Sequence, residues 1–340
     1  MPPTTSTRVA VFTHRPGDYT GALALTAAAL ALLVVGLGAY VRLSDAGLGC
    51  PDWPGCYGHY VGIPTTPAEH AAASSAFPGN PVDPGKAWKE MAHRYLAGTL
   101  GLLVVILFAR AWRHDQRPPV FEGLLLLLIG IQALLGMWTV TLLLKPAIVT
   151  LHLLGGMLTW ALLACRAISR TAACPPVPAS PALQQLAAGA TALLLLQIAL
   201  GGWVSSNYAA LACPDLPTCL GQWWPPGHWS TGFQILRDLG RNADGVPLNA
   251  HALIAIHWAH RVGALITVAA VGTLAWQLAA CTGTRTHGIA LAFLLVLQAS
   301  LGIANVILQL PLPIAVAHNL GAAALLAGTL LAAVRTRRQA

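Results

Sequence analysis

Eight apolar segments, each long enough to cross a bilayer, recur along this chain and constrain its fold more than any other feature. Only 9% of the residues are charged and 56% are hydrophobic, whereas a soluble domain carries about 25% charged residues. We therefore predict an all-α integral membrane protein surrounded by membrane lipid. The predicted spans are residues 20–40, 91–110, 120–143, 147–165, 183–205, 252–279, 287–309 and 314–334.

The distribution of basic residues predicts how the spans are oriented. Basic residues in short loops mark the cytoplasmic side, and 11 of the 19 Lys and Arg residues lie in the two tails and in the short loops on their side. We therefore expect both termini in the cytoplasm and the long loops, 41–90 and 206–251, on the outer face of the cell membrane. The net charge of +8 then reflects topology and predicts no nucleic-acid partner. The polar first 19 residues ahead of a long span predict an uncleaved anchor. The 11 residues are Arg8, Arg15, Arg110, Arg113, Arg117, Arg166, Arg170, Arg285, Arg335, Arg337 and Arg338.

The sequence contains the same series of motifs twice. A Cys-x5-Cys pair, a His-Arg pair, a Gln-x3-Gly step and a His-x2-Gly step occur in this order in each half, at offsets of 163, 167, 166 and 166 residues. We predict two pseudo-symmetric four-helix bundles, residues 1–165 and 183–340, joined by a Pro-rich cytoplasmic linker at 166–182. Because each half has an even number of spans, the axis relating them should lie along the membrane normal. The motifs begin at Cys50, His93, Gln132 and His152, and again at Cys213, His260, Gln298 and His318.

Four histidines lie near the predicted outer ends of spans: His93, His152, His260 and His318. The separation within a pair is 59 residues in the first half and 58 in the second, so each bundle should bring two histidines to a common depth. Ionisable side chains inside a membrane are costly and are usually paired or functional. An interhelical hydrogen bond is one alternative, and zinc would need three or four convergent ligands. Two histidines from facing helices are typical of axial haem ligation.

The residue three positions before the first histidine of each pair differs between the halves. It is Glu90 ahead of His93 and His257 ahead of His260. A carboxylate held near haem iron is a candidate acid, base or cation-stabilising group. The alternative is a solvated glutamate that is favoured by the dipole at a helix N-terminus.

Three arginines are candidate partners for haem propionates at the outer face: Arg94, Arg261 and Arg42. The alternative is that their side chains extend to the membrane interface. The second half has Ser205 where the first has Arg42, so a propionate contact from this position is expected only in the N-terminal half.

Four of the seven cysteines lie in the two long loops, as the pairs Cys50/Cys56 and Cys213/Cys219. An oxidising exterior favours disulfides. Such pairs act either as structural clips over the haem edge or as dithiols that exchange electrons. A zinc site formed by all four cysteines together is a further alternative, although the CxxC spacing typical of zinc is absent.

The motifs together resemble those of the haem A synthases. The run from Tyr40 to Gly58 (YVRLSDAGLGCPDWPGCYG) resembles the first outer loop of this family, and so do Glu90-x-x-His93-Arg94, His260-Arg261, His152 and His318. The resemblance covers about residues 20–334, and the cysteine pairs are similar to those of the bacterial and archaeal branch.

This resemblance implies an activity and a role for each half. The family oxidises the C8 methyl of haem O to the formyl group of haem A, by two successive hydroxylations, for use by terminal oxidases. His93 and His152 would then face haem O, with Glu90 as the carboxylate implicated in the chemistry. His260 and His318 would ligate a haem b. The resemblance implies that Cys50 and Cys56 are functionally important, and that Cys213 and Cys219 are more structural.

Two other functions are compatible with the histidine pairs alone. A di-haem cytochrome b that transfers electrons would need both histidine pairs but not the carboxylate of Glu90. A haem carrier for oxidase assembly would need no catalytic group. Besides haem O, the resemblance leaves open three partners: a haem O synthase, assembly factors of terminal oxidases and a second copy of this chain.

Overall fold

The computed structural model describes residues 20–114, 118–171 and 179–336. Within them, ten helices account for the regular structure besides three isolated β-bridges. Eight of these helices are long and apolar enough to span a membrane, which confirms the predicted fold class. They are α1 (Thr20–Leu43), α3 (Pro84–His114), α4 (Val120–Thr141), α5 (Pro146–Thr171), α6 (Pro181–Ser206), α8 (Ala250–Ala280), α9 (Arg285–Ile307) and α10 (Leu312–Arg335). Part of the basic-residue pattern, from Arg8, Arg15, Arg117, Arg337 and Arg338, lies outside the described residues.

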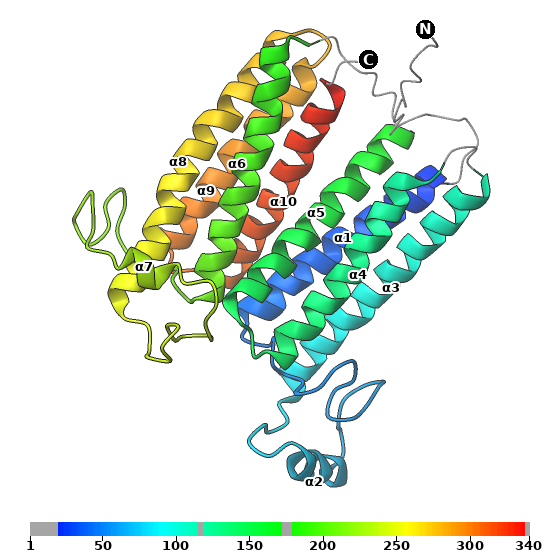
Figure 1. Ribbon diagram of the computed structural model, residues 1–340, viewed down its shortest axis with the longest axis vertical. Helices are drawn as coiled ribbons and strands as arrows, with labels where there is room; N and C mark the ends of the chain where they lie inside the picture. The colour runs from blue at the N-terminus through cyan, green and yellow to red at the C-terminus, as the bar shows by residue number, and fades with distance from the viewer. Residues whose placement is uncertain (1–19, 115–117, 172–178, 337–340) are drawn as a thin grey trace, which may run out of the picture.

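The long helices form two neighbouring groups (Figure 1). In the first group α1 packs against α3 and α5, and α4 packs against the same two helices. In the second, α6 and α9 each pack against α8 and α10. The groups meet where α1 and α5 contact α10 and where α5 contacts α6. Each group therefore places two helices diagonally across a bundle, α3 with α5 and α8 with α10.

Local backbone conformations recur at the sequence offsets of the repeat. Asp45 and Tyr208 are both left-handed, with φ of 50° and 55°. Left-handed pairs also follow α4, at Leu143 and Leu144, and α9, at Gln309 and Leu310. These recurrences support the prediction of two related halves. Pseudo-symmetry of the two bundles stays a prediction.

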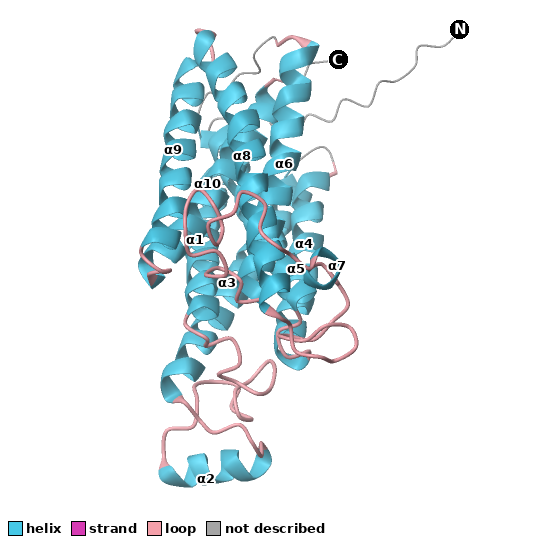
Figure 2. Ribbon diagram, turned by 90° about the vertical axis from the view of Figure 1, so that its left-hand side faces the viewer, coloured by secondary structure: helices cyan, strands magenta, loops and turns pink. Residues whose placement is uncertain are grey.

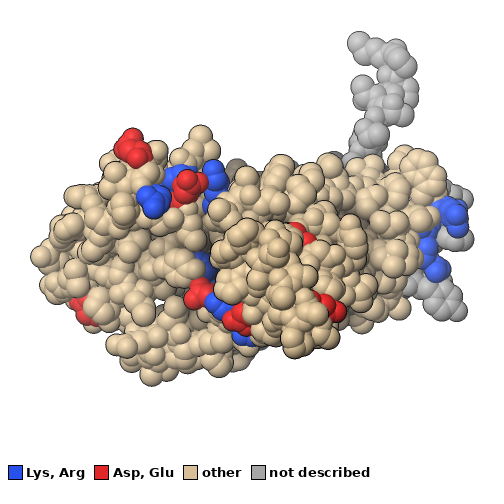
Figure 3. Space-filling view, turned by 90° about the horizontal axis from the view of Figure 1, so that it is seen from below, with Lys and Arg blue, Asp and Glu red and all other residues tan. Residues whose placement is uncertain are grey.

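The two outer loops differ in shape. The first contains α2 (Pro67–Ala76), which lies apart from the bundles (Figure 2). The second contains α7 (Trp229–Gly232), which packs against α8. Thr66 and Glu69 cap the start of α2, and the backbone amides of Thr65 and Thr66 lower the pKa of Glu69 to about 2. From the loop end of the molecule, cations and anions lie close together on a mostly uncharged surface (Figure 3).

The opposite end of the first bundle holds a buried ion pair that the sequence did not predict. Arg166 in α5 donates a hydrogen bond from Nε to Oε1 of Glu122 in α4, at 2.9 Å, and both residues are 4% exposed. We assigned Arg166 to a cytoplasmic loop, but α5 continues to Thr171 and so includes the first residues of the predicted linker. The pair connects α4 to α5 at the end opposite the disulfide loops.

Candidate functional site

The histidines of the first bundle face each other across its interior. His93 comes from α3 and His152 from α5, and their ring centres are 6.5 Å apart. Two metal–imidazole bonds of about 2 Å place the ring centres about 6 Å apart, so the observed space fits one iron ion. The Nδ1 atoms of both rings are buried and have no hydrogen-bond partner in the described part of the chain. The geometry therefore fits axial ligation of a haem.

The second bundle repeats this arrangement with His260 on α8 and His318 on α10. These two residues lie close enough to interact electrostatically. The Nδ1 atom of His318 is likewise buried without a partner among the described residues. The structure therefore pairs the four predicted histidines as the sequence indicated, one pair in each bundle.

Each histidine ring packs against a glycine on a neighbouring helix. A Cβ atom built at the glycine would lie 2.9 to 3.3 Å from Cε1 of the ring, closer than most side chains tolerate. Glycine thus creates the space that the imidazole occupies. Two of these glycines, Gly136 and Gly302, end the Gln-x3-Gly steps of the repeat, but the sequence analysis did not recognise that they face the histidines. The pairs are Gly38 with His93, Gly136 with His152, Gly201 with His260, and Gly302 with His318.

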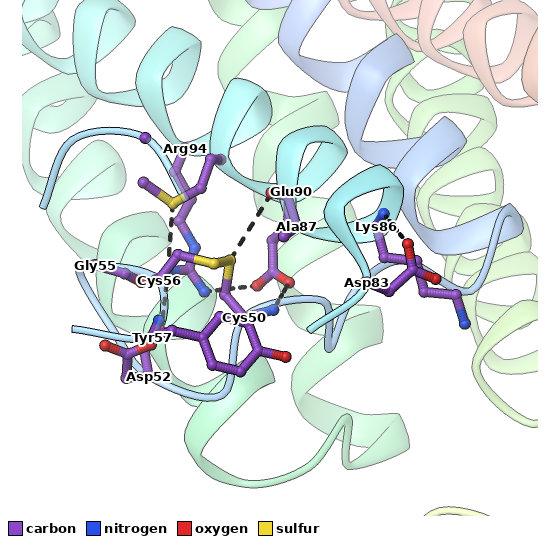
Figure 4. Close-up of a disulfide and its surroundings, with 12 residues drawn as sticks. Cys50, Asp52, Gly55, Cys56, Tyr57, Asp83, Lys86, Ala87, Glu90 and Arg94 are labelled. Carbon is purple, nitrogen blue, oxygen red and sulfur yellow. Dashed lines mark hydrogen bonds and ion pairs between the residues drawn. A yellow bond between two sulfur atoms is a disulfide. The ribbon is translucent and has the colours of Figure 1, made fainter. Parts of the chain in front are cut away.

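Glu90 is buried under the first disulfide loop (Figure 4). Its Oε2 accepts a hydrogen bond from the backbone N–H of Cys50 at 2.9 Å, and its Oε1 lies 2.6 Å from Nη2 of Arg94. Arg94 also donates to the carbonyl oxygens of Asp52 at 3.0 Å and of Gly55. The carboxylate and the guanidinium together hold the loop on the first turns of α3.

His257 has the same position in the second half. The backbone N–H of Cys213 donates to its Nδ1 at 3.2 Å, and Nε of Arg261 lies 3.3 Å from its Nε2. Arg261 also donates to the carbonyl oxygens of Asp215 at 2.7 Å and Thr218 at 2.9 Å. The second half therefore anchors its loop by equivalent contacts without a carboxylate.

Each outer loop is closed by its own disulfide. Cys50 pairs with Cys56 and Cys213 with Cys219, and all four residues are fully buried. In the second loop, the hydroxyl of Thr218 and nearby backbone amides lower the pKa of Asp215 to about 2. The predicted pairing within loops is confirmed.

Arg42 lies at the contact between the two halves. Its Nη2 donates to the carbonyl oxygen of Ser205 at 2.7 Å, and its Nη1 donates to the hydroxyl of Tyr208 at 3.0 Å. The Tyr208 hydroxyl in turn donates to Asp45 at 2.8 Å. The repeat aligned Arg42 with Ser205, and the structure shows that these aligned positions touch. All three arginines thus have protein partners, and their contact with propionates stays a prediction.

A helical membrane protein with one histidine pair inside each of two bundles is typical of proteins that bind haem between helices. Comparison with known proteins identifies the family. Residues 21–330 match the model of the COX15-CtaA family, described as a cytochrome oxidase assembly protein. This chain belongs to that family, the haem A synthases, which are oxidoreductases that convert haem O to haem A.

Several relatives carry the name heme A synthase. The one from Shewanella oneidensis is 46% identical over 298 residues, which cover 87% of this chain and 90% of the relative. The one from Mesorhizobium japonicum is 31% identical over 310 residues, covering 83% and 81%. The one from Halalkalibacterium halodurans is 29% identical over 304 residues, covering 85% and 87%.

Proposed function

We propose that the two halves divide the work of haem A synthesis. The N-terminal half binds haem O between His93 and His152 and is the site where its C8 methyl is oxidised. The C-terminal half holds a haem b between His260 and His318. The observation that carries this proposal is that Glu90 and His257 occupy equivalent positions, so the first half has a carboxylate where the second has an imidazole.

The residues present fit the two haem groups. The separation of the His93 and His152 rings fits one intervening iron ion. Each of the four histidine rings also packs closely against a glycine of a neighbouring helix. Haem b, when bound, would supply one-electron transfer. The protein residues set its ligation, the polarity of its surroundings and its access to solvent.

Glu90 has the properties of a group that acts on developing charge. It is 5% exposed and lies three residues before His93, one turn away on the same side of α3. Two donors, the Cys50 amide and Arg94, fix its orientation. We propose that its carboxylate stabilises the positive charge that develops as electrons leave the methyl carbon. Each of two successive hydroxylations removes two electrons from this carbon and therefore needs an external oxidant, and the resulting geminal diol loses water to form the formyl group.

The variant Glu90→His carries the residue found at the equivalent position of the second half, and it tests the role of the carboxylate in catalysis separately from its role in anchoring the loop. Glu90→His should keep the loop contacts, because His257 makes them in the second half. We expect haem A formation to fall by about 10²- to 10⁴-fold, as for loss of an acid–base group. Haem A and haem O are extracted from cells that supply haem O and are quantified by chromatography.

The matched control is His257→Glu, which places a carboxylate under the second loop. It should retain haem A formation close to that of the wild-type protein. If Glu90→His forms haem A at the wild-type rate, the carboxylate has no part in the chemistry and Glu90 is only a loop anchor.

The location of the site in the membrane follows from the same geometry. The disulfide loops and the arginines that anchor them lie at the histidine end of the bundles. We propose that this end is the outer face of the cell membrane and that both termini are cytoplasmic. Arg94 and Arg261 would then hold the loops over the haem edges, within reach of propionates. Labelling of an introduced cysteine in each loop with a membrane-impermeant reagent tests this orientation.

A further inference from the structure

An apolar groove runs along the neighbouring helices α3 and α4 of the first bundle. It has a volume of about 550 Å³ and is lined by Phe108 of α3 and by one face of α4 between Gly123 and Leu134. None of the lining residues has a polar side chain. At a rise of 1.5 Å per residue, this stretch of α4 is about 16 Å long. The groove therefore fits a long, narrow hydrocarbon chain.

Two glycines of α4 line the groove at positions where side chains would fill it. No described atom lies within 4 Å of a Cβ built at Gly130, and a Cβ built at Gly123 meets Phe108 at an ordinary 3.5 Å. Side chains at both positions would therefore fit without moving the helices. Because glycine is unfavourable in a helix interior, the folding of α4 does not explain these two residues.

The second bundle has bulky residues at the aligned positions. The offset of 166 residues aligns Gly123 with Ile289 and Gly130 with Val296. These side chains are 55% and 67% exposed on α9, so they cover the surface that the glycines leave open in the first bundle. The half assigned to haem O thus has an open face where the half assigned to haem b has a filled one.

The groove begins at the depth of the haem O site. Leu134, at one end of the groove, lies two residues before Gly136, against which the ring of His152 packs. Residues two apart on a helix point in nearly opposite directions, so a chain that leaves the haem for the groove must pass between α3 and α4. A Cβ built at Gly101 of α3 would lie 3.6 Å from Ile129 of α4. The missing side chain of Gly101 therefore widens the gap between the two helices.

Haem O and haem b differ in one substituent that fits this groove. Haem O carries a hydroxyethylfarnesyl chain where haem b has a vinyl group, at the edge of the porphyrin opposite the propionates. With the propionates toward the disulfide loops, the chain leaves the ring toward the other end of the bundle, as the groove does from Leu134 to Gly123. Lipid tails are as apolar as the groove, so the benefit of this contact is the orientation of the ring.

We propose that the groove along α3 and α4 binds the farnesyl chain of haem O, and that it thereby selects haem O over haem b and selects the methyl group that is oxidised. This inference rests on the proposed assignment of haem O to the N-terminal half. Turning the porphyrin over with its propionates at the same edge exchanges the C8 methyl with the methyl of the other propionate-bearing ring. A chain held in the groove permits one of these two orientations.

The test fills the groove with the residues of the second half. The double variant Gly123→Ile, Gly130→Val is purified as full-length protein with haem b in its C-terminal half. Haem O or further haem b is then titrated into the N-terminal half and followed by absorbance. We expect the affinity for haem O to fall about 10-fold or more, because a change of one methylene in an apolar pocket discriminates by about 10- to 200-fold. The affinity for haem b, which lacks the chain, should be unchanged.

The product of the remaining turnover tests the orientation of the ring. Chromatography should separate haem A from a second isomer that carries the formyl group on the other propionate-bearing ring. Haem A as the single product of the double variant would contradict the role of the groove in selecting the methyl.

Gly189→Val on α6 is the matched control for the binding test. Gly189 is also exposed in the middle of a long helix and has no described atom within 4 Å of a built Cβ, but it lies outside the groove. This variant should bind haem O as the wild-type protein does. If the double variant binds haem O with wild-type affinity, or loses affinity for both haems equally, the groove holds a lipid tail and the proposal is wrong.

His93→Ala separates a failure of the groove from a failure of the underlying assignment. If His93→Ala still binds haem O with wild-type affinity, haem O does not bind in the N-terminal half as proposed. If His93→Ala loses haem O but the double variant binds it normally, only the role of the groove is overturned.

Discussion

The two halves of this haem A synthase hold their outer loops in the same way but with different chemistry. In each, the first cysteine of the disulfide donates its backbone N–H to a side chain on the following long helix, and an arginine one turn later contacts that side chain. The side chain is a carboxylate in the first half, Glu90, and an imidazole in the second, His257. Loop anchoring therefore does not require a carboxylate. This difference supports the proposal that the carboxylate of Glu90 has a catalytic role in the first half.

After the loss of activity expected for Glu90→His, the next largest effect should come from filling the space beside a histidine ring. Gly38→Ala would place a Cβ atom 2.9 Å from Cε1 of His93. Overpacking of this kind costs about 1–3 kcal/mol, which corresponds to roughly a 10- to 100-fold loss of haem O affinity if the ring alone moves. Titration of haem O into the purified protein, followed by absorbance, measures this loss.

Gly36→Ala is the matched control on the same helix. Its Cβ atom would meet Leu320 at an ordinary 3.4 Å, so binding of haem O should be unchanged. Equal losses of haem O affinity in the two variants would show that the effect of Gly38→Ala does not come from its contact with His93.

A smaller effect is expected from removing the disulfides. Each closes a short loop, and its loss should destabilise that loop by about 2 kcal/mol. The double variant of Cys50 and Cys56 to Ala should lower haem A yield, because the Cys50 amide orients Glu90. The same change at Cys213 and Cys219 should lower thermal stability with little effect on yield. Yields that fall equally would show that the two loops are functionally equivalent.

The sequence predicted the spans, the histidine pairs and the disulfides because each depends on local pattern or on the repeat. It did not predict the partner of Glu90, since the Cys50 amide lies 40 residues away in the chain and only the folded loop brings them together. It also missed α2 and α7, which are too short and polar to stand out from the loops around them. The inter-half contact of Arg42 depends on how the two bundles pack, which no local pattern encodes.

The measurement that tests the division of labour most directly is the haem content of variants that lack one ligand in each half. His93→Ala and His260→Ala are purified from cells that supply haem O, and their pigments are extracted and separated. The account predicts that His93→Ala retains haem b and lacks haem O and haem A, and that His260→Ala lacks haem b but still binds haem O. Loss of the same pigment from both variants would contradict separate roles for the two halves.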